Sequence, residues 1–219
     1  MKRVITQMNK PEIILVGGGG HCKSCIEVIE DEGVYDIKGI IDLPNLLGTK
    51  TMGYSVIGND DELPKFIVQG YSFLISMGHL GNANRRNQLF EHISSLGGNL
   101  PIIIAPSAFV SKRAKIQNGT IIMHQCIVNA DSSIGSNCIV NNKSLIEHES
   151  SIGNHCHIAT GTIVNGNCTV GLESFLGSGT ILKNGISISR KAIIGAGSLV
   201  VKNIEMPGTY IGSPVNKIN

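Results

Sequence analysis

The chain has 219 residues, of which 42% are hydrophobic and 4% aromatic; 27 are glycine and none is Trp. This composition favours a core of aliphatic and small residues with many tight turns, and disfavours an aromatic-rich globular core. The net charge of +2, from 18 basic and 16 acidic residues, is too small to indicate binding to nucleic acid or to an anionic membrane surface.

The N-terminal segment, MKRVITQMNKPEIILVGG, has no apolar run long enough for a signal peptide. No stretch of the chain approaches the roughly 20 apolar residues of a membrane span. We therefore expect a cytoplasmic protein without a membrane partner. In that compartment its six Cys are expected to be free thiols.

The chain up to residue 103 alternates predicted strands with predicted helices. Strands are expected at residues 12–16, 37–42 and 72–77. A helix with an apolar face is expected after the first strand, a short helix capped by Asn59 before the third, and another helix within residues 84–96. Strands that alternate with helices predict a parallel α/β sheet, so residues 1–103 are taken as one α/β domain.

A glycine run, Gly17 to Gly20, follows the first predicted strand. Main-chain amides at a strand-to-helix turn suit a phosphate, but the dinucleotide fingerprint fails because Cys22 stands where its third glycine belongs. A nucleotide half-site remains, with Asp42 where such folds place a ribose-binding acid. The alternative is a tight turn and a solvated acid. Cys22 and Cys25 form a CxxC pair, but both lie on the apolar helix face, which favours burial over redox chemistry.

From Ile104 to Val200, every sixth residue is Ile, Val or Leu without exception. A second position, four residues after each of these, is nearly always small and includes Cys126, Cys138, Cys156 and Cys168. Each six-residue unit is interpreted as a short strand and a corner, with three units to a coil and residues 18 apart stacked on one another. Residues 104–219 are therefore predicted to form an all-β left-handed parallel β-helix with a short C-terminal tail.

The phase of the repeat assigns several residues. The four Cys point inward as packing residues, which removes them as metal ligands or nucleophiles. The position directly after each aliphatic residue favours Gly, Asn, Ala or Ser, which we attribute to their tolerance of tight corners. No insertion interrupts the units, so no long loop is expected to project from the β-helix.

Three histidines lie close together in the sequence: His148, His155 and His157, beside Glu147 and Glu149. A zinc site, surface histidines and a catalytic histidine are the three interpretations. The repeat places His148 at a corner and the other two on outward positions from other parts of the coil, so they do not converge within one chain. Catalysis by one of them is favoured, and no metal is expected.

These residues carry a family resemblance. The hexads, together with ILVGGGGHCK, GIID, ISMG, NNKSLIEHESSIGNHCHIATG and GTYIGSPVNKI, resemble the hexapeptide-repeat acyltransferases. Within them the chain is similar to the bacillosamine- and perosamine-type UDP- or GDP-amino-sugar N-acetyltransferases and their sialic acid O-acetyltransferase relatives. The resemblance implies a Rossmann-like sugar-nucleotide domain before the β-helix. It also implies acetyl-CoA as co-substrate, and a homotrimer with its sites between subunits.

The resemblance also implies residue roles. His148 is the general base, since histidine titrates near neutral pH, and Glu149 orients it. His157 contacts acetyl-CoA. The remaining implied contacts are Gly166, Ser178 and Ala196 for CoA, and Gly19, Gly20, His21, Asp42 and Gly78 for the sugar nucleotide. Independently of the resemblance, the 18-residue stacking puts Gly166 directly above His148.

The expected function is acetyl-CoA-dependent N-acetylation of a nucleotide-linked amino sugar, of the UDP-4-amino-4,6-dideoxy type, for bacterial surface glycan synthesis. O-acetylation of a sialic-acid-type sugar needs the same base and stays open. So do a non-catalytic, sugar-nucleotide-binding β-helix and, more remotely, a γ-class carbonic anhydrase. Two departures from the family pattern, the longer segment GHLGNANRR and Leu43 in place of a second acid, leave the sugar and the nucleotide open.

Overall fold

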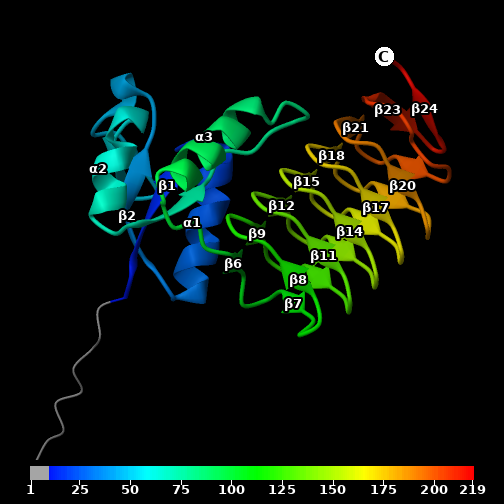
Figure 1. The fold of residues 1–219 in the computed structure, drawn as a ribbon, viewed down its shortest axis with the longest axis horizontal. Coiled ribbons are helices and arrows are strands. Elements are labelled where there is room, and N and C mark those ends of the chain that lie inside the picture. The colour runs from blue at the N-terminus through cyan, green and yellow to red at the C-terminus, as the bar shows by residue number, and fades with distance from the viewer. Residues whose placement is uncertain (1–9) are drawn as a thin grey trace, which may run out of the picture.

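The computed structural model describes residues 10–219, which form an α/β domain followed by a long solenoid (Figure 1). The first nine residues lie outside the described residues. They include the start of the predicted first domain and part of the segment considered as a signal peptide. Within residues 10–219, no helix is long and apolar enough to cross a membrane.

The N-terminal domain is built on a five-stranded sheet in the order β3-β4-β2-β1-β5. Its strands are β1 (Glu12–Val16), β2 (Asp36–Ile41), β3 (Lys50–Thr51), β4 (Tyr54–Gly58) and β5 (Ser72–Ile75). All are parallel except β3, which pairs antiparallel with β4. The three predicted strands and the parallel sheet are confirmed. The β3–β4 hairpin was missed by the sequence analysis.

The helices of this domain follow the predicted pattern. They are α1 (Gly20–Glu32), the 3-10 helices η1 (Pro44–Leu46) and η2 (Asp60–Glu62), α2 (Leu63–Val68) and α3 (Asn84–Ser95). The apolar face of α1, including Cys22 and Cys25, is fully buried. Asn59 caps η2 in a reciprocal capping box with Glu62, as expected from its position before three acidic residues.

The solenoid has three faces, each a parallel sheet of short strands. Face 1 consists of β6 (Ile103–Ile104), β9 (Ile121–Ile122), β12 (Ile139–Val140), β15 (His157–Ile158), β18 (Phe175–Leu176) and β21 (Ala192–Ile194). Face 2 consists of β7 (Phe109–Val110), β10 (Ile127–Val128), β13 (Leu145–Ile146), β16 (Ile163–Val164), β19 (Ile181–Leu182) and β22 (Leu199–Val200). Face 3 consists of β8 (Lys115–Ile116), β11 (Ser133–Ile134), β14 (Ser151–Ile152), β17 (Thr169–Val170) and β20 (Ser187–Ile188).

The register between coils is 18 residues up to Val200, as predicted, and 16 residues where Ile188 pairs with Ile204 and Ile194 with Tyr210. Ile127 pairs with Leu145 on face 2, and Ile139 pairs with His157 on face 1. The inward aliphatic residues from Ile122 to Val200 and the four inward Cys are buried, whereas Ile104, Val110 and Ile116 of the first coil are partly buried. Each coil therefore buries its apolar side chains against its neighbours. A hairpin of β23 (Gly208–Gly212) and β24 (Val215–Lys217) continues face 1 at the far end.

The backbone at the corners shows that the explanation given for the glycines after the aliphatic residues is wrong. The left-handed backbone conformation falls on the third residue after the aliphatic position, as at Glu149 (φ 60°) and His155 (φ 61°). The glycines that directly follow the aliphatic residues do not adopt the left-handed conformation. A Cβ on Gly171 would lie 2.4 Å from the main-chain nitrogen of Arg190 in the next coil. These glycines therefore serve the close approach of stacked coils, not the corner dihedral.

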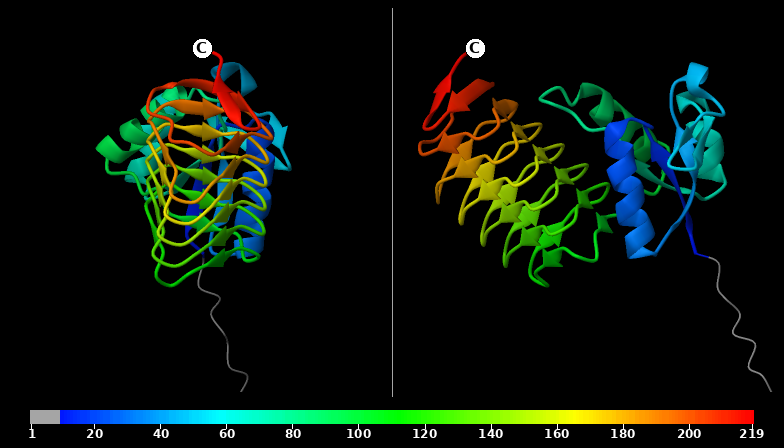
Figure 2. Two further views of the ribbon diagram at one scale, coloured as in Figure 1. Left: turned by 90° about the vertical axis from the view of Figure 1, so that its right-hand side faces the viewer. Right: turned by 180° about the vertical axis from the view of Figure 1, so that it is seen from behind.

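The two domains pack against each other along face 1. The segment before α3, and α3 itself, extend over β9, β12, β15 and β18 (Figures 1 and 2). Arg86 of α3 donates hydrogen bonds to the carbonyls of Ile75 and Met77 and, at 3.3 Å, to that of Asn137 in the solenoid. The outward side chains of face 1 are consequently buried from Ile121 to Phe175.

Candidate active site

His148 stands at the corner between face 2 and face 3, where β13 ends. Its side chain is 57% exposed, and its Nδ1 lies 3.2 Å from Oε2 of Glu149. The left-handed backbone at Glu149 aims that carboxylate back toward the imidazole ring. A ring nitrogen that donates to a carboxylate leaves Nε2 as the acceptor, so this pair presents a base to solvent.

Gly166 lies in the next coil against the ring of His148, as the stacking predicted. A Cβ on Gly166 would lie 2.6 Å from Cε1 and 2.7 Å from Nε2 of the imidazole. No other residue type fits here without moving the ring. The two other residues predicted to contact CoA, Ser178 and Ala196, are exposed and stack on the corner between face 1 and face 2. The predicted CoA residues therefore occupy two different edges of the solenoid.

The glycine turn is open on its outer side. A Cβ on Gly19 or Gly20 would meet no atom within 4 Å, and α1 begins at Gly20 without a side-chain cap. Asp42 stabilises the turn, because its carboxylate accepts hydrogen bonds from the amides of Gly18 (2.6 Å) and Leu43 (2.7 Å). Uncapped amides at a helix N-terminus are suited to an anion such as a phosphate.

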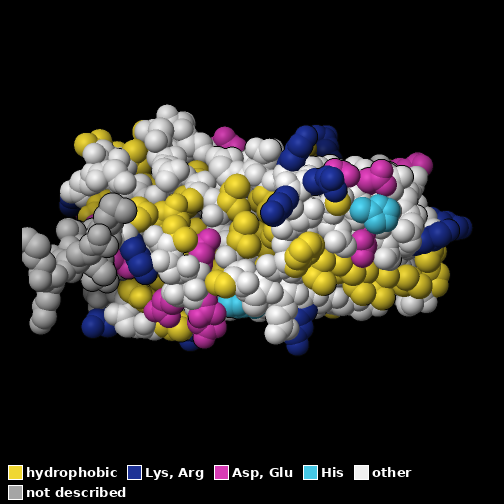
Figure 3. All heavy atoms as spheres, turned by 90° about the horizontal axis from the view of Figure 1, so that it is seen from below, with side chains coloured by type: hydrophobic (Ala, Val, Ile, Leu, Met, Phe, Trp, Pro, Cys, Tyr) yellow, Lys and Arg dark blue, Asp and Glu magenta, His cyan; other side chains and the backbone are white. Residues whose placement is uncertain are grey.

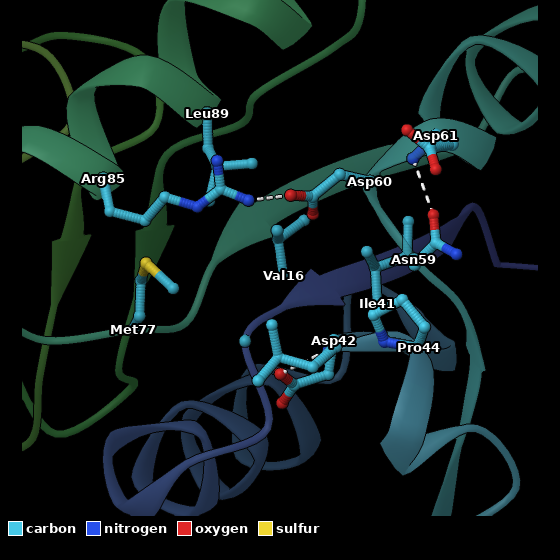
Figure 4. Close-up of a pocket in the computed structure, with 12 residues that line it drawn as sticks. Val16, Ile41, Asp42, Pro44, Asn59, Asp60, Asp61, Met77, Arg85 and Leu89 are labelled. Atoms are coloured by element: carbon cyan, nitrogen blue, oxygen red, sulfur yellow. Dashed lines mark hydrogen bonds and ion pairs between the residues drawn. The ribbon is translucent and has the colours of Figure 1, made fainter.

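A cavity of about 380 Å³ opens beside this turn, at the carboxyl ends of β1, β2 and β4. Apolar side chains form its floor, and Arg85 reaches across it from α3 to pair with Asp60 of η2 (Figure 4). Its lining consists of Val16, Gly17, Ile41, Asp42, Leu43, Pro44, Asn59, Asp60, Asp61, Met77, Arg85 and Leu89. Ligands of open parallel sheets bind at this position.

His21 and His157, which the family resemblance assigns to the sugar nucleotide and to acetyl-CoA, are packed between the domains with ring centroids 6.2 Å apart. Nδ1 of His157 lies 2.8 Å from the main-chain carbonyl of His79. Burial lowers the pKa of His21 and His79 to about 3 and that of His157 to about 4. Gly78 packs against His21, since a Cβ there would lie 3.6 Å from that of His21.

Comparisons with known proteins agree with this architecture. Residues 12–93 match the family model of the PglD N-terminal domain. A histidine-to-asparagine mutant of perosamine N-acetyltransferase from Caulobacter crescentus, solved with CoA and GDP-perosamine, is 30% identical. The match covers 95% of this chain and 97% of that chain, with a TM-score of 0.89. The acetyltransferase domain of PglB from Neisseria gonorrhoeae FA1090, solved with acetyl coenzyme A, is 28% identical over 96% of this chain and 100% of that chain, with a TM-score of 0.89.

The chain belongs to the hexapeptide-repeat sugar acetyltransferases. A further match is the uncharacterized protein L142 of Acanthamoeba polyphaga mimivirus, 34% identical over 122 residues. That match covers 55% of this chain but only 23% of the viral protein, so the chain spans less than a quarter of that relative.

For this acetyltransferase, the predicted site residues lie in four groups. Gly19, Gly20 and Asp42 lie at the turn and cavity, and His21, Gly78 and His157 lie between the domains. His148 stands with Glu149 and Gly166 at the corner between faces 2 and 3, whereas Ser178 and Ala196 stack on the corner between faces 1 and 2. Sequence reasoning missed His79, Arg86 and the pair of Arg85 with Asp60. The one available signal was the unusual length of GHLGNANRR, which contains three of these four residues.

Proposed function

We propose that this acetyltransferase is an N-acetyltransferase that transfers the acetyl group of acetyl-CoA to a nucleotide-linked amino sugar. We take the sugar to be of the UDP-4-amino-4,6-dideoxy type, and the product to serve bacterial surface glycan synthesis in the cytoplasm. The observation that carries the proposal is the base at the corner: an exposed His148, oriented by Glu149, beside backbone left bare by Gly166.

The chemistry follows from that geometry. The neutral imidazole of His148 accepts a proton at Nε2 as the sugar amine attacks the thioester carbonyl. The carbon–sulfur bond then breaks, the amide forms, and the thiol of CoA leaves with a proton. The carboxylate of Glu149, 3.2 Å from Nδ1, stabilises the imidazolium that forms in between.

The nucleotide is proposed to bind the N-terminal domain. Its diphosphate would accept hydrogen bonds from the open amides at Gly19 and Gly20, where the N-terminus of α1 favours negative charge. The adjacent cavity, with an apolar floor and acidic groups at Asp42 and Asp60, would hold the nucleoside. The cation of Arg85 is paired to Asp60 across this cavity, which therefore suits neutral hydrogen-bond donors better than phosphate.

A homotrimer is proposed from the outward side chains of face 2. They form an apolar row that no segment of residues 10–219 covers: Phe109, Ile127, Leu145, Ile163, Ile181 and Leu199, of which Phe109 is 59% exposed. The underside of the molecule shows a band of hydrophobic side chains along the solenoid (Figure 3). Face 3, by contrast, presents Lys115, serines and Thr169. An apolar row of this length indicates an interface, and we assign it to further copies of this chain.

The interface predicts the effect of a charge placed on face 2. Ile127→Lys buries an ammonium against a neighbouring copy and is expected to convert the trimer to monomers. Light scattering after size exclusion measures the mass. Ser187→Lys on face 3 is the matched control and should remain trimeric. A wild-type chain that is monomeric at micromolar concentration would contradict the assignment.

The function itself is tested by substrate. Purified protein is assayed for CoA release from acetyl-CoA with UDP- and GDP-linked 4-amino sugars and with sialic acids. Acetylation of an amino sugar is the expected result, and turnover of sialic acids alone would favour the O-acetyltransferase alternative. His148→Ala is expected to lower kcat by about 100-fold or more without loss of nucleotide binding. Undiminished turnover in that variant would exclude His148 as the base.

A further inference from the structure

The segment between β5 and α3 carries a histidine that the proposed function leaves without a role. His79 is 7% exposed, although it lies in a connection and not in a helix or strand. Its imidazole packs on two outward side chains of face 1, with ring centroids 5.4 Å from His157 and 6.1 Å from Phe175. Two residues on, Gly81 lies against Ile193, where a Cβ would be 2.5 Å from the isoleucine side chain. The segment thus follows face 1 along three successive coils.

His79 also sets the protonation of His157. Its main-chain carbonyl is 2.8 Å from Nδ1 of His157. A carbonyl only accepts, so Nδ1 must carry the proton, and in the neutral ring Nε2 is a bare acceptor. Burial lowers the pKa of His157 to about 4, which keeps the ring neutral at pH 7. In this protein His157 is therefore fixed in one tautomer by a residue of the other domain.

The same segment begins at the predicted sugar-nucleotide site. Gly78, directly before His79, packs on His21, and the ring of His21 in turn lies 6.2 Å from that of His157. Nε2 is buried without a hydrogen-bond partner in each of His21, His79 and His157. Burying three nitrogens without hydrogen-bond partners costs free energy, so we expect the three rings to shift when a ligand contacts either side of the interface.

We propose that His79 is a positioning residue that couples the sugar-nucleotide site to the acetyl-CoA site, by holding His157 through its carbonyl and its ring. The proposal rests on the proposed function, together with the contact between His157 and acetyl-CoA that the family resemblance implies. A ligand seated against Gly78 and His21 would favour one placement of His79 and hence one placement of His157. By reciprocity, acetyl-CoA would favour the same placement and tighten nucleotide binding by the same factor.

Calorimetric titration of the full-length protein tests the coupling. Acetyl-CoA is titrated with and without saturating UDP, and separately GDP, as probes of the N-terminal domain. One nucleotide is expected to lower the Kd of acetyl-CoA by about fivefold or more. In His79→Ala this ratio should fall to about 1, because the ring that packs on His157 and Phe175 is gone. His79→Phe, which keeps an aromatic ring and the carbonyl, should restore it.

The matched control is Leu80→Ala, since Leu80 is the neighbouring residue and is 85% exposed. It should keep the wild-type ratio. Acetyl-CoA binding that ignores both nucleotides in the wild type, or an undiminished ratio in His79→Ala, overturns the coupling alone. Failure to bind acetyl-CoA at all overturns the proposed function and the coupling together, so the two failures are distinguishable.

A second readout does not depend on either ligand. In protein labelled with ¹⁵N-histidine, the imidazole nitrogens of His157, assigned with His157→Gln, should report the neutral tautomer protonated at Nδ1. A ring protonated at Nε2 would remove the carbonyl of His79 as its partner and overturn the proposal. This measurement also decides the matter if His79→Ala fails to fold.

Discussion

Gly166 has a role that its own chemistry does not suggest. The three atoms nearest to an added Cβ are Cε1, Nε2 and Nδ1 of His148. The main chain of Gly166 is part of the stacked coil, whereas the imidazole is exposed and free to turn. A side chain at this position would therefore displace the ring before it displaced the backbone.

Gly166→Ala is accordingly predicted to separate activity from stability. The methyl group turns the imidazole away from its pairing with Glu149, and a displacement of about 1 Å costs on the order of 10- to 100-fold in rate. Steady-state assays should show this loss in kcat, while thermal unfolding shifts little. Ser187→Ala, an exposed change on face 3, serves as control. A fall in melting temperature that accounts for the lost activity would contradict this view of Gly166.

The residues of the corner could be predicted because they belong to one repeat. The phase of the hexads located His148, its stacking under Gly166 and the inward Cys126 and Cys168 from the sequence alone. The same phase put His157 on an outward position but could not predict that its side chain is buried. Its burial depends on His79, 78 residues earlier in the chain, and no period links the two domains.

At the level of the elements, the coils followed from the six-residue period, α1 from apolar residues at helical spacing, and β1 from a short apolar run. The β3–β4 hairpin was not predicted, because β3 has only the two residues Lys50–Thr51, too few to show an alternating pattern. The corners were located correctly but explained wrongly. Nine non-glycine residues after Met52 adopt φ of 55–62° at corners, and the glycines beside the aliphatic positions instead admit the next coil's backbone.

Two glycine substitutions test this distinction between corner positions. In Gly171→Ala the three atoms nearest to the new Cβ are main-chain atoms of Ser189 and Arg190, which cannot turn aside, so we expect a loss of about 3 kcal/mol in unfolding free energy. In Gly161→Ala the Cβ meets nothing within 4 Å, and the left-handed φ of 68° costs only about 1 kcal/mol. Urea denaturation measures both. Equal losses would restore the dihedral explanation.

For the whole molecule, the contact between the domains is unusually polar. Arg86 is 1% exposed, its Nε and Nη1 donate only to main-chain carbonyls, and its buried Nη2 has no hydrogen-bond partner. Burial lowers the pKa of this guanidinium to about 10. Beside it, His21, His79 and His157 are held neutral, mainly by burial and secondarily by this cation and by one another. The sequence could not reveal this arrangement, because its members come from α1, the segment before α3, α3 and β15.

Because these histidines have lowered pKa values, we predict that acid lowers the free energy of unfolding by acting at the domain interface. Their folded pKa values, about 3 to 4, lie below the ordinary value of about 6.5, so the unfolded chain binds more protons once the pH falls below 6.5. The contribution to stability is complete above pH 6.5 and declines as the pH falls toward 4. At pH 5 each ring costs roughly 2 kcal/mol. Urea unfolding at pH 7.5, 6 and 5 measures how the unfolding free energy changes with pH.

The control variant is His79→Phe, which removes one titrating ring while retaining an aromatic side chain. Its unfolding free energy should fall less steeply with acid than that of the wild type. An identical slope would place the acid sensitivity outside this interface.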